Sequence, residues 1–348
     1  MRGRRRSAVM GGALALALTL AACGGDAGGG APGEGGRTAI TVSSLPSAFL
    51  APMYIAEKDG LFEREGLDVT IVELQSGADG VPAAISGSSQ YADLGFDDLA
   101  TLAAEGEDSL VMVHNLVRRV TFTLVMNPDV ARERGVTRES PIEARYAALK
   151  GLRLGVTSPG AASDKYMRYY LREAGLDPER DAEIIAIGDG ASLLAALETR
   201  QIDAYQLSPP TPYVAQAGGF GTVIIDGPSG DVPRFADFAY TGFAANREWA
   251  EANPEAARAF NRALNAGMQQ VLADPHAAAA KIVDRMSAGD LPVLQQTLDA
   301  LAPALSADGC FDAAAVQSTL AVMHEVELTD TAGDPAEGVL WTNAYNEC

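Results

Sequence analysis

The chain reads LKGLRLGVTSPGAA over residues 149–162, and this stretch decides the fold class. Residues 152–156 form a short apolar run typical of a strand, and residues 157–160 form a turn of small residues. A helix is predicted next, because apolar side chains then recur at helical spacing up to Gly175. A strand, a turn and a helix in this order form the repeating unit of a parallel α/β sheet.

Comparable units occur on both sides of this stretch. Further strands are predicted at residues 40–42, 67–74, 91–96, 184–187, 202–207 and 223–225, and the chain beyond Asn246 is almost wholly helical. Residues 110–126 are rich in β-forming residues and long enough to pass from one lobe to another. Because 348 residues exceed what one hydrophobic core usually serves, we expect two lobes. Lobe 1 should comprise residues 37–125 plus 240–348, and lobe 2 should comprise residues 126–239.

The charge balance excludes some classes of partner. There are 26 Lys and Arg against 46 Asp and Glu, which gives a formal net charge of −20. A surface this acidic repels phosphate, so we expect no nucleic-acid partner. It also argues against docking on anionic lipid through a basic patch.

The N-terminus has the pattern of a targeting segment. An Arg-rich start precedes an apolar run over residues 8–20, which is too short to span a bilayer comfortably. The run ends in Leu20-Ala21-Ala22-Cys23, which resembles the lipobox of bacterial lipoproteins. We therefore expect a signal peptide at residues 1–22, acylation of Cys23 and a Gly-rich tether at residues 23–36. The alternative is a plain secretory signal with an incidental Cys23.

The remaining cysteines are Cys310 and Cys348. Two such residues fit an oxidising exterior, and we expect them to form a disulfide. The alternative is two independent thiols.

Several blocks resemble one family when they are taken in order. They are residues 51–56 (APMYIA), 60–62 (GLF), 66–69 (GLDV), 149–156, 175–177 and 195–204. Together they resemble the nitrate/sulfonate/taurine-type solute-binding proteins, which include binders of the thiamine pyrimidine precursor. One departure is Arg200, where relatives commonly place Gly in the turn before a strand.

The resemblance implies a type II periplasmic-binding-protein fold. In this fold, two α/β lobes joined by two hinge crossings close on a small-molecule solute. It also implies delivery to the permease and ATPase of an ABC importer. We expect a monomer that is anchored by lipid to the outer face of the cytoplasmic membrane.

Parallel sheets bind ligands at the carboxyl ends of their strands, and these ends supply the candidate residues. The ligand-binding candidates are Ser47, Phe49, Ser76, Phe96, Asp97, Asn115, Arg118, Ser158, Gly160, Ala161, Asp189, Ser208 and Tyr240. Arg118 and Arg119 are adjacent on a presumed strand and point to opposite faces, so at most one should reach the ligand.

The candidates indicate a solute class. The turn at Ser158, Gly160 and Ala161 precedes a helix, and free N–H groups at a helix start favour an anion. Asp97 and Asp189 add negative charge, which disfavours a bare anion such as nitrate. We therefore expect a sulfonate, an amino-sulfonate or a related oxyanion. The alternatives are a pyrimidine or flavin-like heterocycle and an orphan sensor protein.

No catalytic motif is present. The sequence lacks G-x-S-x-G, H-E-x-x-H, P-loop and G-x-G-x-x-G patterns, and its three histidines are scattered. The Cys-rich iron motif of a thiamine-pyrimidine synthase with the same fold is also missing. We expect no enzyme activity, no cofactor and no metal.

Overall fold

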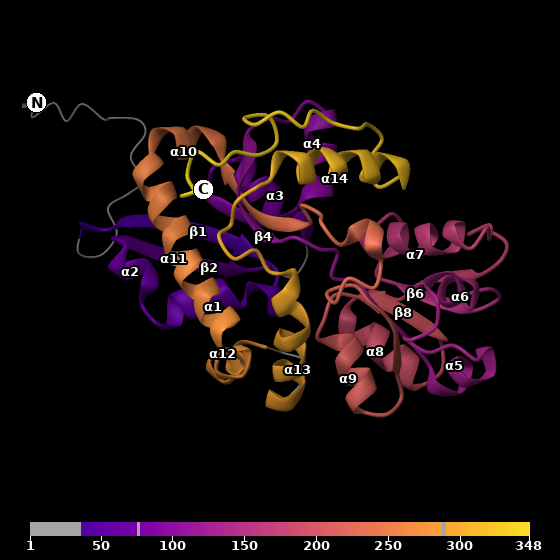
Figure 1. Cartoon of the computed structure of the whole chain (residues 1–348). Helices are drawn as coiled ribbons and strands as arrows, with labels where there is room; N and C mark the ends of the chain where they lie inside the picture. The colour runs from indigo at the N-terminus through magenta and orange to yellow at the C-terminus, as the bar shows by residue number, and fades with distance from the viewer. Residues whose placement is uncertain (1–35, 75–76, 287–289) are drawn as a thin grey trace, which may run out of the picture.

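Two five-stranded sheets lie side by side, each with its own helices, in the computed structural model of the chain (Figure 1). The structure describes residues 36–74, 77–286 and 290–348. The expected signal peptide, Cys23, nearly all of the expected tether, and Ser76 lie outside these residues. The predicted fold class of two α/β lobes is confirmed.

The sheet of lobe 1 has the order β2-β1-β3-β10-β4. Its strands are β1 (Thr38–Ser44), β2 (Leu67–Glu73), β3 (Tyr91–Gly95), β4 (Leu110–Val117) and β10 (Thr241–Asn246). β1 pairs in parallel with β2 and β3, whereas β10 is antiparallel to β3 and β4. The α-helices of this lobe are α1 (Ala51–Lys58), α2 (Leu61–Arg64), α3 (Gly77–Ile85), α4 (Phe96–Ala104), α10 (Arg247–Ala252), α11 (Pro254–Ala273), α12 (Pro275–Ile282), α13 (Leu291–Leu301) and α14 (Ala313–Glu325).

The sheet of lobe 2 has the order β7-β6-β8-β5-β9. Its strands are β5 (Thr123–Met126), β6 (Arg153–Val156), β7 (Glu183–Ala186), β8 (Ala204–Leu207) and β9 (Thr222–Asp226). Its α-helices are α5 (Pro128–Arg134), α6 (Ile142–Ala147), α7 (Ala162–Glu173), α8 (Gly190–Glu198) and α9 (Thr211–Ala217). β6 is parallel to β7 and β8, while β5 is antiparallel to β8 and β9.

The boundary between the lobes differs from the sequence-based expectation. β4 ends at Val117, and β5 begins at Thr123 inside the second sheet. The first crossing is therefore residues 118–122, and residues 123–125 belong to lobe 2 instead of lobe 1. Residues 227–240 form the second crossing, from β9 to β10.

Close backbone contact sets the core of lobe 1. α11 packs against α1 at Gly267, where a Cβ atom would lie 2.2 Å from the carbonyl oxygen of Pro52. The Phe260 ring from α11 stacks on Tyr91 of β3, with 4.1 Å between ring centroids. Gly267 thus lets α11 approach α1 closely, and the stacked rings of Phe260 and Tyr91 fill the space between α11 and β3.

The C-terminal segment covers the outer edge of β4. The Met112 N–H donates to the Leu340 oxygen at 2.9 Å, and the Thr342 N–H donates to the Met112 oxygen at 2.9 Å. The Asn115 N–H donates to the Gly309 oxygen at 2.8 Å. These bonds satisfy backbone groups that an edge strand would otherwise leave open.

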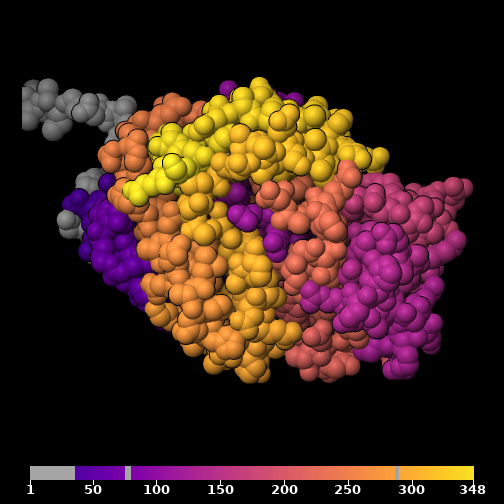
Figure 2. Space-filling model, viewed as in Figure 1, coloured from indigo at the N-terminus to yellow at the C-terminus, as the bar shows by residue number. Residues whose placement is uncertain are grey.

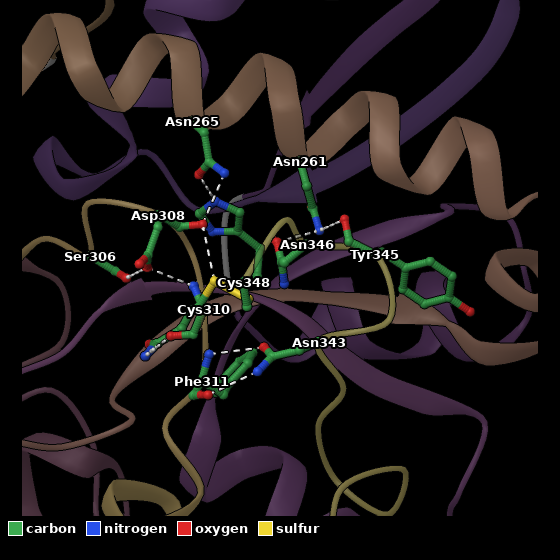
Figure 3. Close-up of a disulfide and its surroundings, with 12 residues drawn as sticks. Asn261, Asn265, Ser306, Asp308, Cys310, Phe311, Asn343, Tyr345, Asn346 and Cys348 are labelled. Carbon is green, nitrogen blue, oxygen red and sulfur yellow. Dashed lines mark hydrogen bonds between the residues drawn. A yellow bond between two sulfur atoms is a disulfide. The ribbon is translucent and has the colours of Figure 1, made fainter.

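A disulfide joins Cys310 to Cys348 within this segment, with 6.0 Å between their Cα atoms (Figure 3). It closes a loop with a sequence separation of 38 residues. Beside it, Asn261 donates to the Tyr345 oxygen at 3.1 Å and to the Asn346 side chain at 2.9 Å (Figure 3). The bonds from Asn261 hold the segment on α11, and the disulfide joins two parts of the segment to each other.

Among the described helices, none is both long and apolar enough to cross a lipid bilayer.

Replacing Cys310 and Cys348 together by Ser should lower the free energy of unfolding by about 2–4 kcal/mol, because the unfolded chain regains the entropy of an open loop. Denaturant titration of the oxidised protein and the variant measures the difference. Equal midpoints and slopes for the two proteins would contradict a structural role for the disulfide.

Candidate functional site

Side chains from both lobes and both crossings meet at the carboxyl ends of the strands. Thr121 of the first crossing and Ser208, which follows β8, lie with their hydroxyl oxygens 2.7 Å apart. Tyr240 of the second crossing accepts a hydrogen bond at its backbone oxygen from the Phe96 N–H at 2.9 Å. This contact places Tyr240 beside the start of α4. We call this meeting point of Thr121, Ser208, Tyr240 and the start of α4 the junction.

An acidic group forms the lobe 1 side of the junction: Asp93 on β3, and Asp97 and Asp98 in the first turn of α4. Burial raises the pKa of Asp93 to about 7, although a hydrogen bond from Thr241 opposes the shift. Desolvation, followed by the charge of Asp97, raises the pKa of Asp98 to about 7. Burial also raises the pKa of Asp97. Negative charge is therefore costly here unless a cation accompanies it.

Gly95 makes this arrangement possible. A Cβ atom at this position would lie 2.6 Å from the Asp97 Oδ1 and 3.0 Å from the Asp98 Oδ2. Both carboxylates therefore fold back over the start of α4, where the helix dipole favours negative charge.

Lys165 is the cation that faces this group. It lies in the first turn of α7, on lobe 2, and its charge lowers the pKa of both Asp97 and Asp98. Its Nζ donates to the Leu328 carbonyl oxygen of lobe 1 at 2.7 Å. Lys165 was not identified as a site residue from the sequence alone. Its position near the start of α7, just after the turn of small residues, could have indicated that it faces the site.

Three aromatic rings line the lobe 2 side of the junction. Phe122 lies edge-on to Tyr166, with ring centroids 5.2 Å apart, and edge-on to Tyr240 at 6.3 Å. The Tyr166 hydroxyl is buried and has no hydrogen-bond partner among the described residues. Burial raises the pKa of the Tyr166 and Tyr240 hydroxyls, so both stay protonated at neutral pH.

The start of α7, expected to bind an anion, already has a carboxylate. The Gly160 N–H donates to Asp164 Oδ2 at 2.8 Å, and the Thr157 N–H donates to Ser163 Oγ at 3.1 Å. Ser158 and Gly160 are exposed, and Ala161 is half-buried. Part of the anion-binding capacity of this helix start is therefore used by Asp164, which weakens the argument for a bare anion.

Several sequence candidates have structural environments instead. Phe96 is buried and packs against Phe311, with ring centroids 6.3 Å apart. The Asn115 side chain is buried and donates to the Cys310 oxygen at 3.4 Å. Asp189 is exposed and caps α8 by accepting from the Ser192 N–H at 2.8 Å. These contacts account for all three residues without a ligand.

The other candidates lie closer to the first lobe or the crossings. Ser47 and Phe49 are half-buried after β1. Arg118 is exposed, whereas Arg119 donates to the carbonyl oxygens of Ala236 and Pro228 in the second crossing. Of the predicted set, the junction brings together Asp97, Ser208 and Tyr240.

A groove of about 510 Å³ lies along the edge strand β9, between lobe 2 and α13. It is lined by Arg138, Tyr213, Asp226, Gln296 and Asp299, among others. Arg138 is already paired with Asp226 at 3.0 Å and with Asp231 at 3.0 Å. Because these charges neutralise one another, we take the junction and not this groove as the candidate site.

In the described part of the chain, no group of three or more His, Cys, Asp or Glu side chains is placed to hold a metal ion.

A model of the NMT1-like family matches residues 33–287. The chain belongs to the NMT1-like family. The family resemblance predicted from the sequence blocks is thereby confirmed.

Two curated relatives of this NMT1-like protein share its sequence over most of the chain. YtlA of Bacillus subtilis is 26% identical over 263 residues, which cover 75% of this chain and 72% of YtlA. The nitrate/nitrite binding protein NrtA of Synechococcus elongatus is 25% identical over 291 residues, covering 73% of this chain and 63% of NrtA.

Solved structures share the fold of this NMT1-like protein. The periplasmic aliphatic sulphonate binding protein SsuA from Escherichia coli superposes with a TM-score of 0.68 at 20% identity, covering 88% of this chain and 98% of SsuA. The alkanesulfonate-binding protein SsuA from Xanthomonas axonopodis pv. citri, bound to MOPS, has a TM-score of 0.66 at 18% identity and covers 85% of this chain and 95% of that one.

Replacing Asp93 by Asn should stabilise the NMT1-like protein at high pH. The raised pKa means that the folded state holds a proton on Asp93 that the unfolded state releases, so wild-type stability is lost as pH rises from about 4 to about 7. Relative to wild type, the free energy of unfolding of the variant should rise by about 2–3 kcal/mol between about pH 5 and pH 8. Denaturant titrations at both pH values measure this gain, with the exposed Glu133→Gln as control. A difference between Asp93→Asn and wild type that does not change with pH would refute the assignment.

Proposed function

We propose that the chain is the extracytoplasmic solute-binding component of an ABC importer. It captures a small organic solute, a sulfonate, amino-sulfonate or related oxyanion, at the junction between its lobes. The observation that carries this proposal is the meeting of polar side chains at the strand ends: Lys165 of lobe 2 faces Asp97 and Asp98 of lobe 1, and Thr121 of the first crossing contacts Ser208 of lobe 2. The family membership and the names of the nitrate-binding and sulphonate-binding relatives support it.

Binding acts through the relative position of the lobes. A solute that contacts both lobes binds the closed arrangement better than the open one, so it shifts the population toward closure. The two crossings are the segments that can change their backbone angles as the lobes move. The permease then recognises the closed protein, and the ATPase drives import; the protein itself performs no chemistry.

The charges of the junction favour one group of solutes. Asp97 and Asp98 are best matched by a cationic nitrogen, whereas Lys165 and the α7 start are matched by an oxyanion. An amino-sulfonate carries both groups. MOPS, the molecule bound by the Xanthomonas relative, also combines a sulfonate with an amine. A bare anion such as nitrate matches only half of the site.

A second candidate is a pyrimidine or flavin-like heterocycle. At the junction, the Phe122 ring centroid lies 5.2 Å from that of Tyr166 and 6.3 Å from that of Tyr240. A planar ligand could stack on such a group, and the unpartnered Tyr166 hydroxyl could donate to a ring nitrogen.

The proposed location follows from the N-terminal pattern. Acylation at Cys23 would anchor the chain to the outer face of the cytoplasmic membrane, and the Gly-rich tether would let a monomer reach its permease.

Thermal shift of the purified protein tests this function against amino-sulfonates, alkanesulfonates, nitrate, carboxylates, pyrimidines and flavins. A solute at a hundred times its dissociation constant should add about 2.7 kcal/mol to the free energy of unfolding. We expect amino-sulfonates to give the largest shift and nitrate none. A shift with heterocycles alone would favour the second candidate, and no shift with any compound would argue against a small-solute importer component.

Replacing Ser158 by Asp should weaken oxyanion binding at least tenfold, because a second carboxylate beside Asp164 repels the solute. The matched control is Ser158→Asn, because Asn has nearly the same shape as Asp and no charge; it should change affinity by less than about threefold. Isothermal titration with the solute identified by thermal shift measures both. Unchanged affinity in Ser158→Asp would remove the α7 start from the site.

A further inference from the structure

The C-terminal part of lobe 1 reaches across to lobe 2. In Figure 1, α14 lies beside α4 and points its C-terminal end toward α7. Figure 2 shows the yellow C-terminal atoms running along one side of lobe 1 until they meet the magenta atoms of lobe 2. This segment lies beyond residues 33–287, the range that the family model matches.

Two cations of lobe 2 and one of the second crossing bind the end of α14 and the turn after it. Arg172 Nη2 donates to the Val326 oxygen at 2.9 Å, and its Nη1 lies 3.0 Å from Glu327 Oε2. Lys165 donates to the Leu328 oxygen at 2.7 Å. Arg234 pairs with Glu325. These contacts join lobe 2 and the second crossing to residues 325–328.

Two of these contacts involve main-chain carbonyl groups: Val326 is the C-cap residue of α14, and Leu328 lies two residues beyond it. Such carbonyl groups carry partial negative charge and have no partners within the helix, so cations satisfy them well. The exposed ion pairs alone would contribute little. The charge-assisted bonds from Lys165 and Arg172 to the carbonyl oxygens are therefore the main contribution.

The turn after α14 is held in an unusual conformation. Glu327 has a φ of 61°, in the left-handed region that non-glycine residues rarely adopt. The Leu328 N–H donates to the Met323 oxygen at 2.8 Å, which closes the turn. In this conformation, Glu327 and the Val326 carbonyl both face Arg172.

The other end of this segment is fixed to lobe 1. The disulfide closes the loop that contains α14, and the Phe311 N–H and oxygen both bond to the Asn343 side chain, at 3.0 and 2.9 Å (Figure 3). The Asn115 side chain of β4 donates to the Cys310 oxygen at 3.4 Å, and the Asn261 side chain of α11 donates to the Tyr345 oxygen at 3.1 Å, which fixes this loop to the rest of lobe 1. Within α14, Thr319 Oγ1 accepts from the Ala239 N–H of the second crossing at 2.9 Å. The segment thus contacts lobe 1, a crossing and lobe 2.

We propose that residues 313–329 are an interlobe strap, which holds the lobes together before a solute arrives. Because the strap contacts lobe 2 only when the lobes are close, it biases the open–closed equilibrium toward closure for every solute. A chain that is already largely closed gains affinity, since less binding energy is needed to change its conformation. This inference does not depend on the class of solute.

Hydrogen exchange of the full chain without any solute tests the strap. Replacing Arg172 and Arg234 together by Ala removes two of the three cations and leaves the junction residues unchanged. We expect amides in residues 236–240 and 319–329 to exchange about tenfold faster, because the open state becomes more populated. Amides of β4 should keep their protection.

The matched control is Arg180→Ala with Arg258→Ala. Each of these arginines pairs within its own lobe, with Asp177 at 2.6 Å and with Glu255 at 2.5 Å. The control removes the same charge and should leave exchange in both segments unchanged. Equal exchange in wild type and the strap variant, or an equal increase in the control, would overturn the proposal. If β4 loses protection in the double variant, the single Arg172→Gln variant is judged by the same criteria.

Discussion

Each crossing of the chain runs directly into an interior strand of the opposite sheet. β5 lies between β8 and β9, and β10 lies between β3 and β4. Every residue of β5 and β10 is buried, so neither strand can leave its sheet without breaking bonds on both sides. Relative motion of the lobes is therefore confined to residues 118–122 and 227–240, and the junction lies where these two segments pass.

The junction keeps groups that a purely structural core would exclude. Asp93 and Asp98 have pKa values raised to about 7, and the Tyr166 hydroxyl has no partner among the described residues. Such features lower the stability of a fold, and they concentrate where a protein must bind something. Lys165 offsets part of the electrostatic cost, because its charge favours ionisation of Asp97 and Asp98.

Local patterns in the sequence were sufficient for the two-lobe architecture, since alternating strands and helices imply it directly. The first lobe boundary was placed a few residues late, because residues 110–126 form one β-rich stretch and periodicity alone does not reveal where a strand leaves one sheet for another. The turn at Arg200 could be predicted locally, because relatives commonly place Gly there. Its φ of 60° agrees with such a turn.

The candidate site was predicted less completely, for reasons that differ by residue. The bond from Asp164 to the Gly160 N–H spans four residues, so an acidic side chain in the first helical turn could have indicated it. The bond from Lys165 to Leu328 spans 163 residues, and no local pattern can indicate such a contact. Phe96 follows a strand as ligand-binding residues do, yet its ring turns into the core beside Phe311.

The covering of β4 by the C-terminal segment bears on how the protein behaves among its own copies. β4 is an edge strand of eight residues, all of them buried. Without residues 304–309 and 340–342 beside it, its free N–H and C=O groups and apolar side chains would offer a template for strand pairing with another molecule. The residues on either side of the strap therefore shield the edge of β4 from pairing with another copy of the chain.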